Sequence, residues 1–298
     1  MSNPEPTAQQ SSQSGSEDES LARLAAVSYL FVPGMRADRF EKAIASGADR
    51  VIIDLEDAVD VADKDQARGL VSAAITEGLS APILVRINPA ETVWFDEDLR
   101  ALAEAAAKNP SGFAGVVIPK LESGAAVAAV LEAFGAASAE LEFVGLIESA
   151  AGVQALDTLA ASGISRLGVG AVDLSVDLGT DISSPVLDFV YAQAVIASRL
   201  AGIGAPIGSP PLDLRADDAT EAEARRLKSM GLAGQLCIHP AQVTPVHAGF
   251  APTTDQVEWA HRVMASEGAA AQVDGQMIDK PVRERAERIL ALAARRSA

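Results

Sequence analysis

Two acidic residues have the type and the surroundings for metal chemistry. Glu148 closes the run FVGLIE, and Asp173 lies in GVGAVDLSVDLG, 25 positions further along the chain. Each follows a short apolar run and precedes helix-like sequence, so both carboxylates are expected at the ends of buried strands. Hard divalent cations such as Mg²⁺ take oxygen ligands and keep open positions for substrate. We predict that this pair holds Mg²⁺, or Mn²⁺ in its place. The alternative for Glu148 is a cap on the helix that begins near Ser149.

A fixed cation is expected beside this pair. Arg86, in ILVRIN, also follows an apolar run. Its planar guanidinium has five donors, which can hold a carboxylate through two hydrogen bonds or stabilise an enolate oxygen. We predict that Arg86 is both a catalytic and a substrate-binding residue, and the alternative is a salt bridge to a nearby acid. Lys120, which follows the run GVVIP, is a second candidate for substrate binding.

Three carboxylates follow another apolar run within four positions. They are Asp54, Glu56 and Asp57 in VIIDLEDAV. Like charges so close together raise the pKa of one member, which is useful in a general acid or base. We predict that Glu56 and Asp57 are catalytic, with Glu56 near the metal or Arg86 and Asp57 orienting. The alternative is a structural network with Arg86 or Arg68.

The elements that must position these residues alternate along the chain. Eight strand-like runs occupy 28–32, 51–55, 83–87, 115–119, 142–147, 166–170, 205–209 and 235–239. Ala-rich amphipathic stretches lie between them at 36–47, 63–78, 96–108, 121–138, 150–162, 185–202 and 216–230. The strand runs are continuously apolar, which is typical of parallel strands buried on both faces. Eight such units predict an α/β fold, a (β/α)₈ TIM barrel, whose chemistry lies at the carboxyl ends of the strands.

The two ends of the chain differ from this pattern. Residues 1–20 are rich in Ser, Gln, Glu and Pro and contain no large apolar residue, so they are expected to form a disordered tail. The barrel is expected over 21–254, ending in a Pro-containing loop at 240–254. Residues 255–298 are expected to form a helical extension, with helices at 255–268 and 281–296. The 12-residue link 269–280 leaves the last helix either docked on its own chain or reaching a neighbouring subunit.

Composition excludes several classes of partner. The 298 residues carry a net charge of −17, of which residues 1–20 supply four acids and no base. Nucleic acids and anionic membranes both require basic patches, so neither is expected as a partner. The single Cys237 fits a reducing compartment, and neither a membrane span nor a signal peptide is visible. We therefore expect a cytoplasmic protein.

Two further features have ordinary explanations. Pro33 and Gly34 predict a tight turn after the first strand, where Arg36 and Arg39 follow and could meet a phosphate. Asp177, four residues after Asp173, is expected to be a charge on a helix face.

The motifs as a set resemble those of a known family. LFVPG (30–34), DLEDAV (54–59), LVRIN (84–88), GVVIPKLES (115–123), LIES (146–149), DLG (177–179) and CIHP (237–240) are similar to the citrate lyase β-subunit-like CoA ester lyases of the HpcH/HpaI aldolase and citrate lyase superfamily. The resemblance implies a TIM barrel, Mg²⁺, a homotrimer or homohexamer, and cleavage or formation of carbon–carbon bonds in 3-hydroxyacyl-CoA esters. By position, Glu148 and Asp173 match its metal ligands, Arg86 its substrate arginine, and Glu56 and Asp57 its acidic pair.

Three departures from the family pattern bear on the substrate. Val172 stands where many members carry Glu, which leans toward the Asp-Leu-Ser pattern of the HpcH-type pyruvate aldolases. Gln235 stands where many carry Lys, and GSPPLDLRADD replaces the usual Ile-Asp-Thr stretch after strand seven. The HpcH-type aldolases use a strand-two histidine, however, which DLEDAV lacks.

The predicted function is a Mg²⁺-dependent carbon–carbon lyase that acts on a 3-hydroxyacyl-CoA ester similar to malyl-CoA or citramalyl-CoA, through an acyl-CoA enolate. One alternative is an HpcH-type aldolase on free 4-hydroxy-2-oxo acids. Another is a non-catalytic barrel that binds CoA esters. The general base is expected to be Glu56, Asp57 or a carboxylate from a neighbouring subunit.

Overall fold

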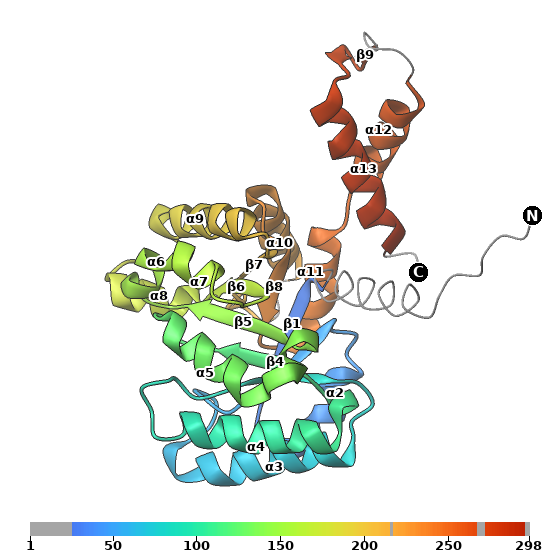
Figure 1. Cartoon of the computed structure of the whole chain (residues 1–298). Helices are drawn as coiled ribbons and strands as arrows, with labels where there is room; N and C mark the ends of the chain where they lie inside the picture. Colours follow the sequence, from blue (N-terminus) through green and yellow to red (C-terminus); the bar gives the residue numbers. More distant parts are fainter. Residues whose placement is uncertain (1–25, 215–216, 267–271, 296–298) are drawn as a thin grey trace, which may run out of the picture.

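Eight parallel strands close into a barrel in chain order in the computed structural model, which describes residues 26–214, 217–266 and 272–295 (Figure 1). The strands are β1 (Ser28–Pro33), β2 (Arg50–Asp54), β3 (Ile83–Arg86), β4 (Phe113–Ile118), β5 (Glu142–Ile147), β6 (Arg166–Val169), β7 (Gly204–Gly208) and β8 (Gly234–Cys237). β8 pairs with β1 through Ser28 and Gln235, which completes the ring. The predicted TIM barrel is confirmed. The predicted tail, residues 1–20, lies outside the described residues.

Helices surround the barrel and extend beyond it. They are α2 (Phe40–Ile44), α3 (Lys64–Glu77), α4 (Phe95–Lys108), α5 (Gly124–Phe134), α6 (Ala150–Gln154), α7 (Leu156–Ala160), α8 (Ala171–Leu178), α9 (Pro185–Ala201), α10 (Asp217–Met230), α11 (Val243–Phe250), α12 (Thr254–Ala265) and α13 (Lys280–Arg295). Within these ranges, no helix has both the length and the apolarity needed to cross a bilayer.

The predicted loop at 240–254 was wrong, because α11 occupies its middle. Pro245 suggested a break in regular structure, but it lies in the first turn of α11. The backbone N–H groups of a first turn have no partner inside the helix, so proline loses nothing there. The predicted helix at 150–162 is also divided, into α6 and α7.

Both faces of the barrel strands are buried, which is why the strand runs are continuously apolar. Alternate residues point inward and outward: Ile52 and Leu84 pack in the small core inside the barrel. Ile53 and Val85, one position further on, pack in the larger core under the helices. Alternation combined with helices on the outer face leaves neither side of a strand in water.

A polar cluster fills the amino-terminal end of the barrel. Tyr29 donates to Glu142 Oε1 at 2.7 Å, and Arg166 Nη1 donates to the Tyr29 hydroxyl at 2.7 Å. Arg50 Nε bonds the other oxygen of Glu142 at 2.9 Å. Burial raises the pKa of Tyr29 above its ordinary value, so it stays a neutral donor. This end of the barrel is therefore held by paired charges, and the reactive groups lie at the other end.

The C-terminal segment forms an arm that projects from the barrel. In Figure 1, α12 and α13 lie side by side, with the short hairpin of β9 (Gln272–Val273) and β10 (Gln276–Met277) at the far end. The arm has a small apolar core of its own, made by Ala260, Val263, Ile278, Ala286 and Ile289. α13 therefore packs mainly on α12 and not on the barrel.

Candidate functional site

Charged side chains gather at the carboxyl ends of β2, β3, β4 and β5, as the barrel predicts. Asp54 ends β2, Arg86 ends β3, and Lys120 and Glu148 follow β4 and β5 closely. Register brings them together, since Asp54 pairs with Arg86 across β2 and β3. Asp173 differs from the prediction: β6 ends at Val169, so Asp173 lies in the first turn of α8 and not at a strand end.

Arg86 forms a forked ion pair with Asp54. Its Nε and Nη2 donate to the two Asp54 oxygens at 2.7 and 2.6 Å. The backbone N–H groups of Glu56 and Ala58 donate to the same carboxylate. Asp54 thus occupies the Nε and Nη2 edge of the guanidinium, the edge expected to bind a substrate carboxylate. Nη1 is the donor that is left to face the site. The alternative reading of Arg86, a salt bridge to a nearby acid, is confirmed, and its catalytic and substrate-binding role stays a prediction that rests on Nη1.

Glu56 lies between the two cations of the site. Its Oε2 is 2.9 Å from Arg86 Nη1, and its Oε1 accepts from Lys120 Nζ at 2.6 Å. The contact to Arg86 is an ion pair without hydrogen-bond alignment, so Oε2 is enclosed and has no hydrogen-bond partner. Burial raises the pKa of Glu56, against the opposing charges of Arg86 and Lys120. A buried carboxylate with an unsatisfied oxygen is suited to accepting a proton.

Asp57 has a weaker place in the cluster. It lies 3.6 Å from Arg86 Nη1 and 3.5 Å from Lys120 Nζ, and more than half of its side chain is exposed. Asp57 therefore lies at the rim of the cluster, and its orienting role stays a prediction. The local backbone is fixed independently, because the buried Lys64 donates to the carbonyls of Leu55 and Glu56 at 2.7 and 2.6 Å.

Lys120 connects Glu56 to Glu148. Its ammonium bonds Glu56, while its backbone N–H donates to Glu148 Oε2 at 2.8 Å. This residue has φ +46°, a conformation that a non-glycine residue adopts only at a cost. In this left-handed conformation the backbone N–H and the side chain of Lys120 are directed to two different carboxylates.

Glu148 is a buried carboxylate among other negative charges. Burial raises its pKa to about 7, the charge of Glu56 adds to the rise, and the Lys120 N–H and Arg86 oppose it. The charge of Asp173 also raises it. Its packing depends on Gly170, where a Cβ would lie 2.5 Å from Glu148 Oε1. Ser149, not Glu148, caps α6, since the Ser149 hydroxyl accepts from Gly152 N–H, which makes the alternative role for Glu148 wrong.

Asp173 is held near Glu148 by the way α8 begins. The buried Ser209, at the end of β7, donates to the carbonyl of Val169 and accepts from the N–H of Ala171, each at 2.6 Å. One hydroxyl thus joins the end of β6 to the start of the helix that carries Asp173. The neighbouring Asp177 accepts from the N–H of Ala150 at 2.7 Å, so it fixes α6 and is not a simple surface charge.

The donor set of this site fits a hard divalent cation. Glu148 and Asp173 supply carboxylate oxygens, and their mutual repulsion, with that of Glu56, is what a cation of charge +2 relieves. Among the described residues, no group of three or more His, Cys, Asp or Glu side chains is arranged to hold a metal. Mg²⁺ is commonly bound by one or two carboxylates with waters and substrate, so a pair suffices.

Sequence reasoning missed two residues that support this site. Gly170 was given no role, yet its lack of a side chain makes room for Glu148. Ser209 is the second residue of the segment that departs from the family pattern, and its hydroxyl positions α8. The signal for both was a small residue at the last position of a predicted strand.

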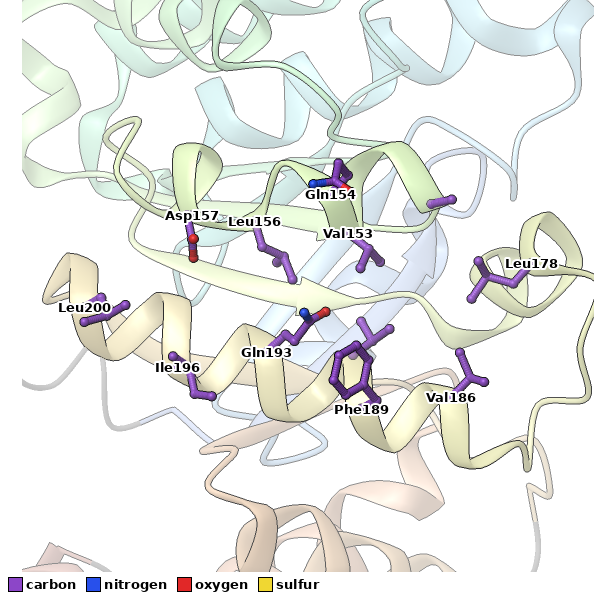
Figure 2. Close-up of a pocket in the computed structure, with 12 residues that line it drawn as sticks. Val153, Gln154, Leu156, Asp157, Leu178, Val186, Phe189, Gln193, Ile196 and Leu200 are labelled. Atoms are coloured by element: carbon purple, nitrogen blue, oxygen red, sulfur yellow. The ribbon is translucent and has the colours of Figure 1, made fainter.

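Two cavities lie away from these charges. One, of about 550 Å³, lies between α9 and α6–α7 (Figure 2). The other, of about 490 Å³, lies between α9 and the turn at Ser209–Leu212. Neither is lined by Arg86, Glu148 or Asp173. The site is therefore assigned from convergent charges at the strand ends, where barrel chemistry occurs.

Comparison with known proteins agrees with this geometry. A family model described as HpcH/HpaI aldolase/citrate lyase matches residues 27–240. The citrate lyase subunit beta-like protein of Deinococcus radiodurans is 33% identical, over 88% of this chain and 95% of the relative. The L-malyl-CoA/beta-methylmalyl-CoA lyase of Cereibacter sphaeroides is also 33% identical, over 81% of this chain and 84% of the relative.

A solved structure shows the same relationship. The protein CitE from Mycobacterium tuberculosis, in complex with magnesium, acetoacetate and coenzyme A, superposes with a TM-score of 0.77 at 32% identity. The match covers 91% of this chain and 99% of that one.

Proposed function

The chain belongs to the HpcH/HpaI aldolase/citrate lyase family, and from this premise we propose that it cleaves and forms the carbon–carbon bond of a small 3-hydroxyacyl-CoA ester, similar to malyl-CoA or citramalyl-CoA. It is a carbon–carbon lyase, as its citrate lyase and malyl-CoA lyase relatives indicate. The observation that carries the finer proposal is the meeting of Glu148 and Asp173 with the Nη1 edge of Arg86, which Glu56 also contacts, at the carboxyl end of the barrel.

The cofactor in this proposal is Mg²⁺, with Mn²⁺ as a substitute. Glu148 and Asp173 would hold it. When bound, the cation supplies Lewis-acid stabilisation of the substrate oxygens at the bond that breaks. Magnesium in the related CitE structures supports this assignment, as does the like-charge repulsion around Glu148.

Arg86 and Glu56 carry the proton and charge movements of the proposed reaction. In the cleavage direction, Glu56 Oε2 accepts the proton of the 3-hydroxyl group. The bond between C2 and C3 then breaks, its electron pair passes to the acyl-CoA fragment as an enolate, and C3 becomes a carbonyl. Arg86 Nη1 faces the developing negative charge. Asp57 and Lys120 keep Glu56 oriented, and Lys120 also binds substrate charge.

Cationic groups near the end of β1 support a CoA ester over a free acid. Arg36 and the exposed Arg39 follow the turn at Pro33 and Gly34. Arg36 is paired with Asp38 through two bonds of 2.8 Å at the surface, a pair that water and phosphate can readily exchange. We propose that these guanidinium groups meet the CoA phosphates. The relative with coenzyme A bound is consistent with a site for this ligand.

A second candidate is the Mg²⁺-dependent aldolase on free 4-hydroxy-2-oxo acids. Val172, in the exposed first turn of α8 beside Asp173, takes the position where many lyase members carry Glu. Loss of that carboxylate makes the metal surroundings more like those of the aldolases. The two functions differ in whether a CoA thioester is required.

The test is a direct comparison of substrates. Purified protein is assayed with malyl-CoA, citramalyl-CoA and free 4-hydroxy-2-oxo acids, in EDTA and in Mg²⁺. We expect turnover of a thioester that disappears in EDTA and returns with Mg²⁺ or Mn²⁺. Cleavage of the free acids alone would replace the lyase proposal with the aldolase, and binding of CoA esters without turnover would make the chain a non-catalytic barrel.

Matched variants separate the metal ligands from their neighbours. Glu148→Ala and Asp173→Ala are each expected to lose at least 100-fold in turnover with the fold intact by circular dichroism. Asp177→Ala removes a carboxylate from the same helix as Asp173 and is expected to keep most of the activity. Near-normal turnover of either ligand variant would remove that residue from the site.

A further inference from the structure

An exposed apolar seam runs along α9. Val186, Phe189, Ile196 and Leu200 lie on one face of this helix at 46%, 62%, 59% and 78% exposure, respectively. With Gln193 they follow each other at spacings of three, four, three and four residues. This is the spacing of the a and d positions by which one helix packs against another. No helix of the described chain covers the seam, so it is a packing surface without its partner.

The seam lines one wall of a groove. The opposite wall is made by α6 and α7, with Val153 and Leu156 pointing toward α9, and Leu178 of α8 closes one end (Figure 2). The groove has a volume of about 550 Å³. The charged Asp188 of α9 lies away from the seam, where it pairs with Arg226 of α10. Gln154 and Asp157 also line the opposite wall, so the groove is apolar mainly along α9, where an amphipathic helix could lay its apolar face.

A single polar residue stands at the middle of the seam. Gln193 lies seven positions after Val186 and seven before Leu200, with Phe189 four before it and Ile196 three after it. Its side-chain Oε1 is enclosed and has no hydrogen-bond partner. A lone polar side chain in a helix seam fixes register when a second amide faces it. Rotation of the terminal amide, which has a broad torsional preference, presents either end to such a partner.

We propose that α9 packs antiparallel against α9 of a second copy of this chain, about a two-fold axis at Gln193. An isologous contact requires a surface that is complementary to itself. The seam meets this condition, because reversal about Gln193 places Val186 against Leu200 and Phe189 against Ile196 of the other copy. The two Gln193 amides then bond each other. A parallel arrangement would place each residue against its own copy.

The size of the surface agrees with a partner that is another folded chain. The seam spans about 21 Å of helix. Contiguous exposed apolar patches of more than a few hundred Å² are rare on monomers and mark interaction sites, and the four exposed side chains of the seam form one contiguous row. A stable interface covers about 800 Å² on each partner, so the contact must include the α6–α7 wall and its polar rim as well as the seam. A two-fold contact requires an even number of subunits, so of the two assemblies that the resemblance implies it fits the homohexamer and not the homotrimer.

Cross-linking at the axis is the sharpest test. The native Cys237 is buried, so a new cysteine on α9 is the reactive one. Gln193→Cys is expected to give a covalent dimer with a short bis-maleimide, because the two residues meet at the axis. Leu200→Cys is the matched control: its two copies lie about 20 Å apart in the antiparallel arrangement, so it is expected to remain uncoupled.

Mass in solution provides the second measurement. Phe189→Asp and Ile196→Asp are each expected to halve the mass found by sedimentation velocity, with the melting temperature unchanged because both side chains are exposed. Val61→Asp replaces another exposed apolar residue and is expected to keep the wild-type mass. The proposal is overturned if Gln193→Cys stays uncoupled, if Leu200→Cys couples to itself, or if the seam variants keep the wild-type mass.

Discussion

Gly170 and the carboxylate of Glu148 are so close that no side chain fits between them. A Cβ at position 170 would lie 2.5 Å from Glu148 Oε1 and 2.6 Å from its Cγ. Adjacent strands fix this approach, since the N–H of Gly170 donates to the carbonyl of Ile147 at 3.0 Å. The position of the proposed metal carboxylate therefore depends on a residue that has no functional group.

Gly170→Ala is expected to displace Glu148 and to reduce Mg²⁺ affinity and turnover about 10–100-fold, the usual effect of disturbing the support of a metal ligand. Metal affinity is measured by calorimetry on the isolated protein, so the result does not depend on an assay. Gly69→Ala is the control, because a methyl group on α3 there meets nothing; it should leave affinity unchanged. Unaltered Mg²⁺ binding in Gly170→Ala would contradict the assigned ligand.

Glu148→Gln is expected to stabilise the metal-free protein while abolishing metal binding. The folded-state pKa of Glu148 is raised from 4.5 to about 7. A raised carboxyl pKa means that ionisation costs more in the folded state, so stability falls as pH rises from about 4.5 to 7. Above pH 7 the cost is complete, about 3 kcal/mol.

Urea unfolding in EDTA at pH 8 and pH 5.5 measures this effect. The variant should exceed the wild type in free energy of unfolding at pH 8, with a smaller gap at pH 5.5. Saturating Mg²⁺ should reverse the order, since only the wild type gains from binding. A variant less stable than the wild type in EDTA at pH 8 would disprove the argument.

Arg86→Lys is expected to cost both activity and stability. Lysine cannot form the fork that fills both oxygens of Asp54, and a broken buried ion pair costs about 3–5 kcal/mol. We expect at least a 100-fold loss of kcat together with a lower unfolding midpoint. Arg36→Lys, which alters a similar fork at the surface, should leave the midpoint unchanged. Full stability of Arg86→Lys would show that the Asp54 pair contributes little.

Asp49, which bonds the start of β1, is expected to make the free energy of unfolding fall at acid pH. Burial acts to raise its pKa, but hydrogen bonds from His247 and from the N–H groups of Val27 and Ser28 outweigh it and lower the pKa to about 2. Its stabilisation is therefore complete above about pH 4 and is lost as pH falls toward 2.

The side chain is about one-third exposed, so solvent screening reduces this contribution to about 1–2 kcal/mol. Asp49→Asn should lower the free energy of unfolding at pH 7 by this amount and should reduce its loss between pH 4 and 2. If the free energy of unfolding falls equally in the two proteins between pH 4 and 2, the lowered pKa of Asp49 is refuted.

Much of the fold and of the candidate site follows from local sequence. The apolar runs at Val51–Ile53 and Ile83–Val85 predicted buried parallel strands, because only such strands are apolar on both faces. Once a barrel is inferred, residues after the strands share one end, which is how Arg86 and Glu148 were found. The metal was predicted from the two carboxylates Glu148 and Asp173, but the lyase activity required the order of motifs shared with a family.

The tertiary structure alone decided how these groups are paired. Arg86 bonds Asp54 because β2 and β3 align them in register, whereas the sequence left salt bridge and substrate open. The tertiary structure also decided that Gly170 adjoins Glu148 and that the apolar seam of α9 is exposed on the surface of the protein. An amphipathic pattern records which residues share a face, but not whether that face is covered. Pairing and coverage are contacts between segments distant in sequence, so they exist only once the barrel has closed.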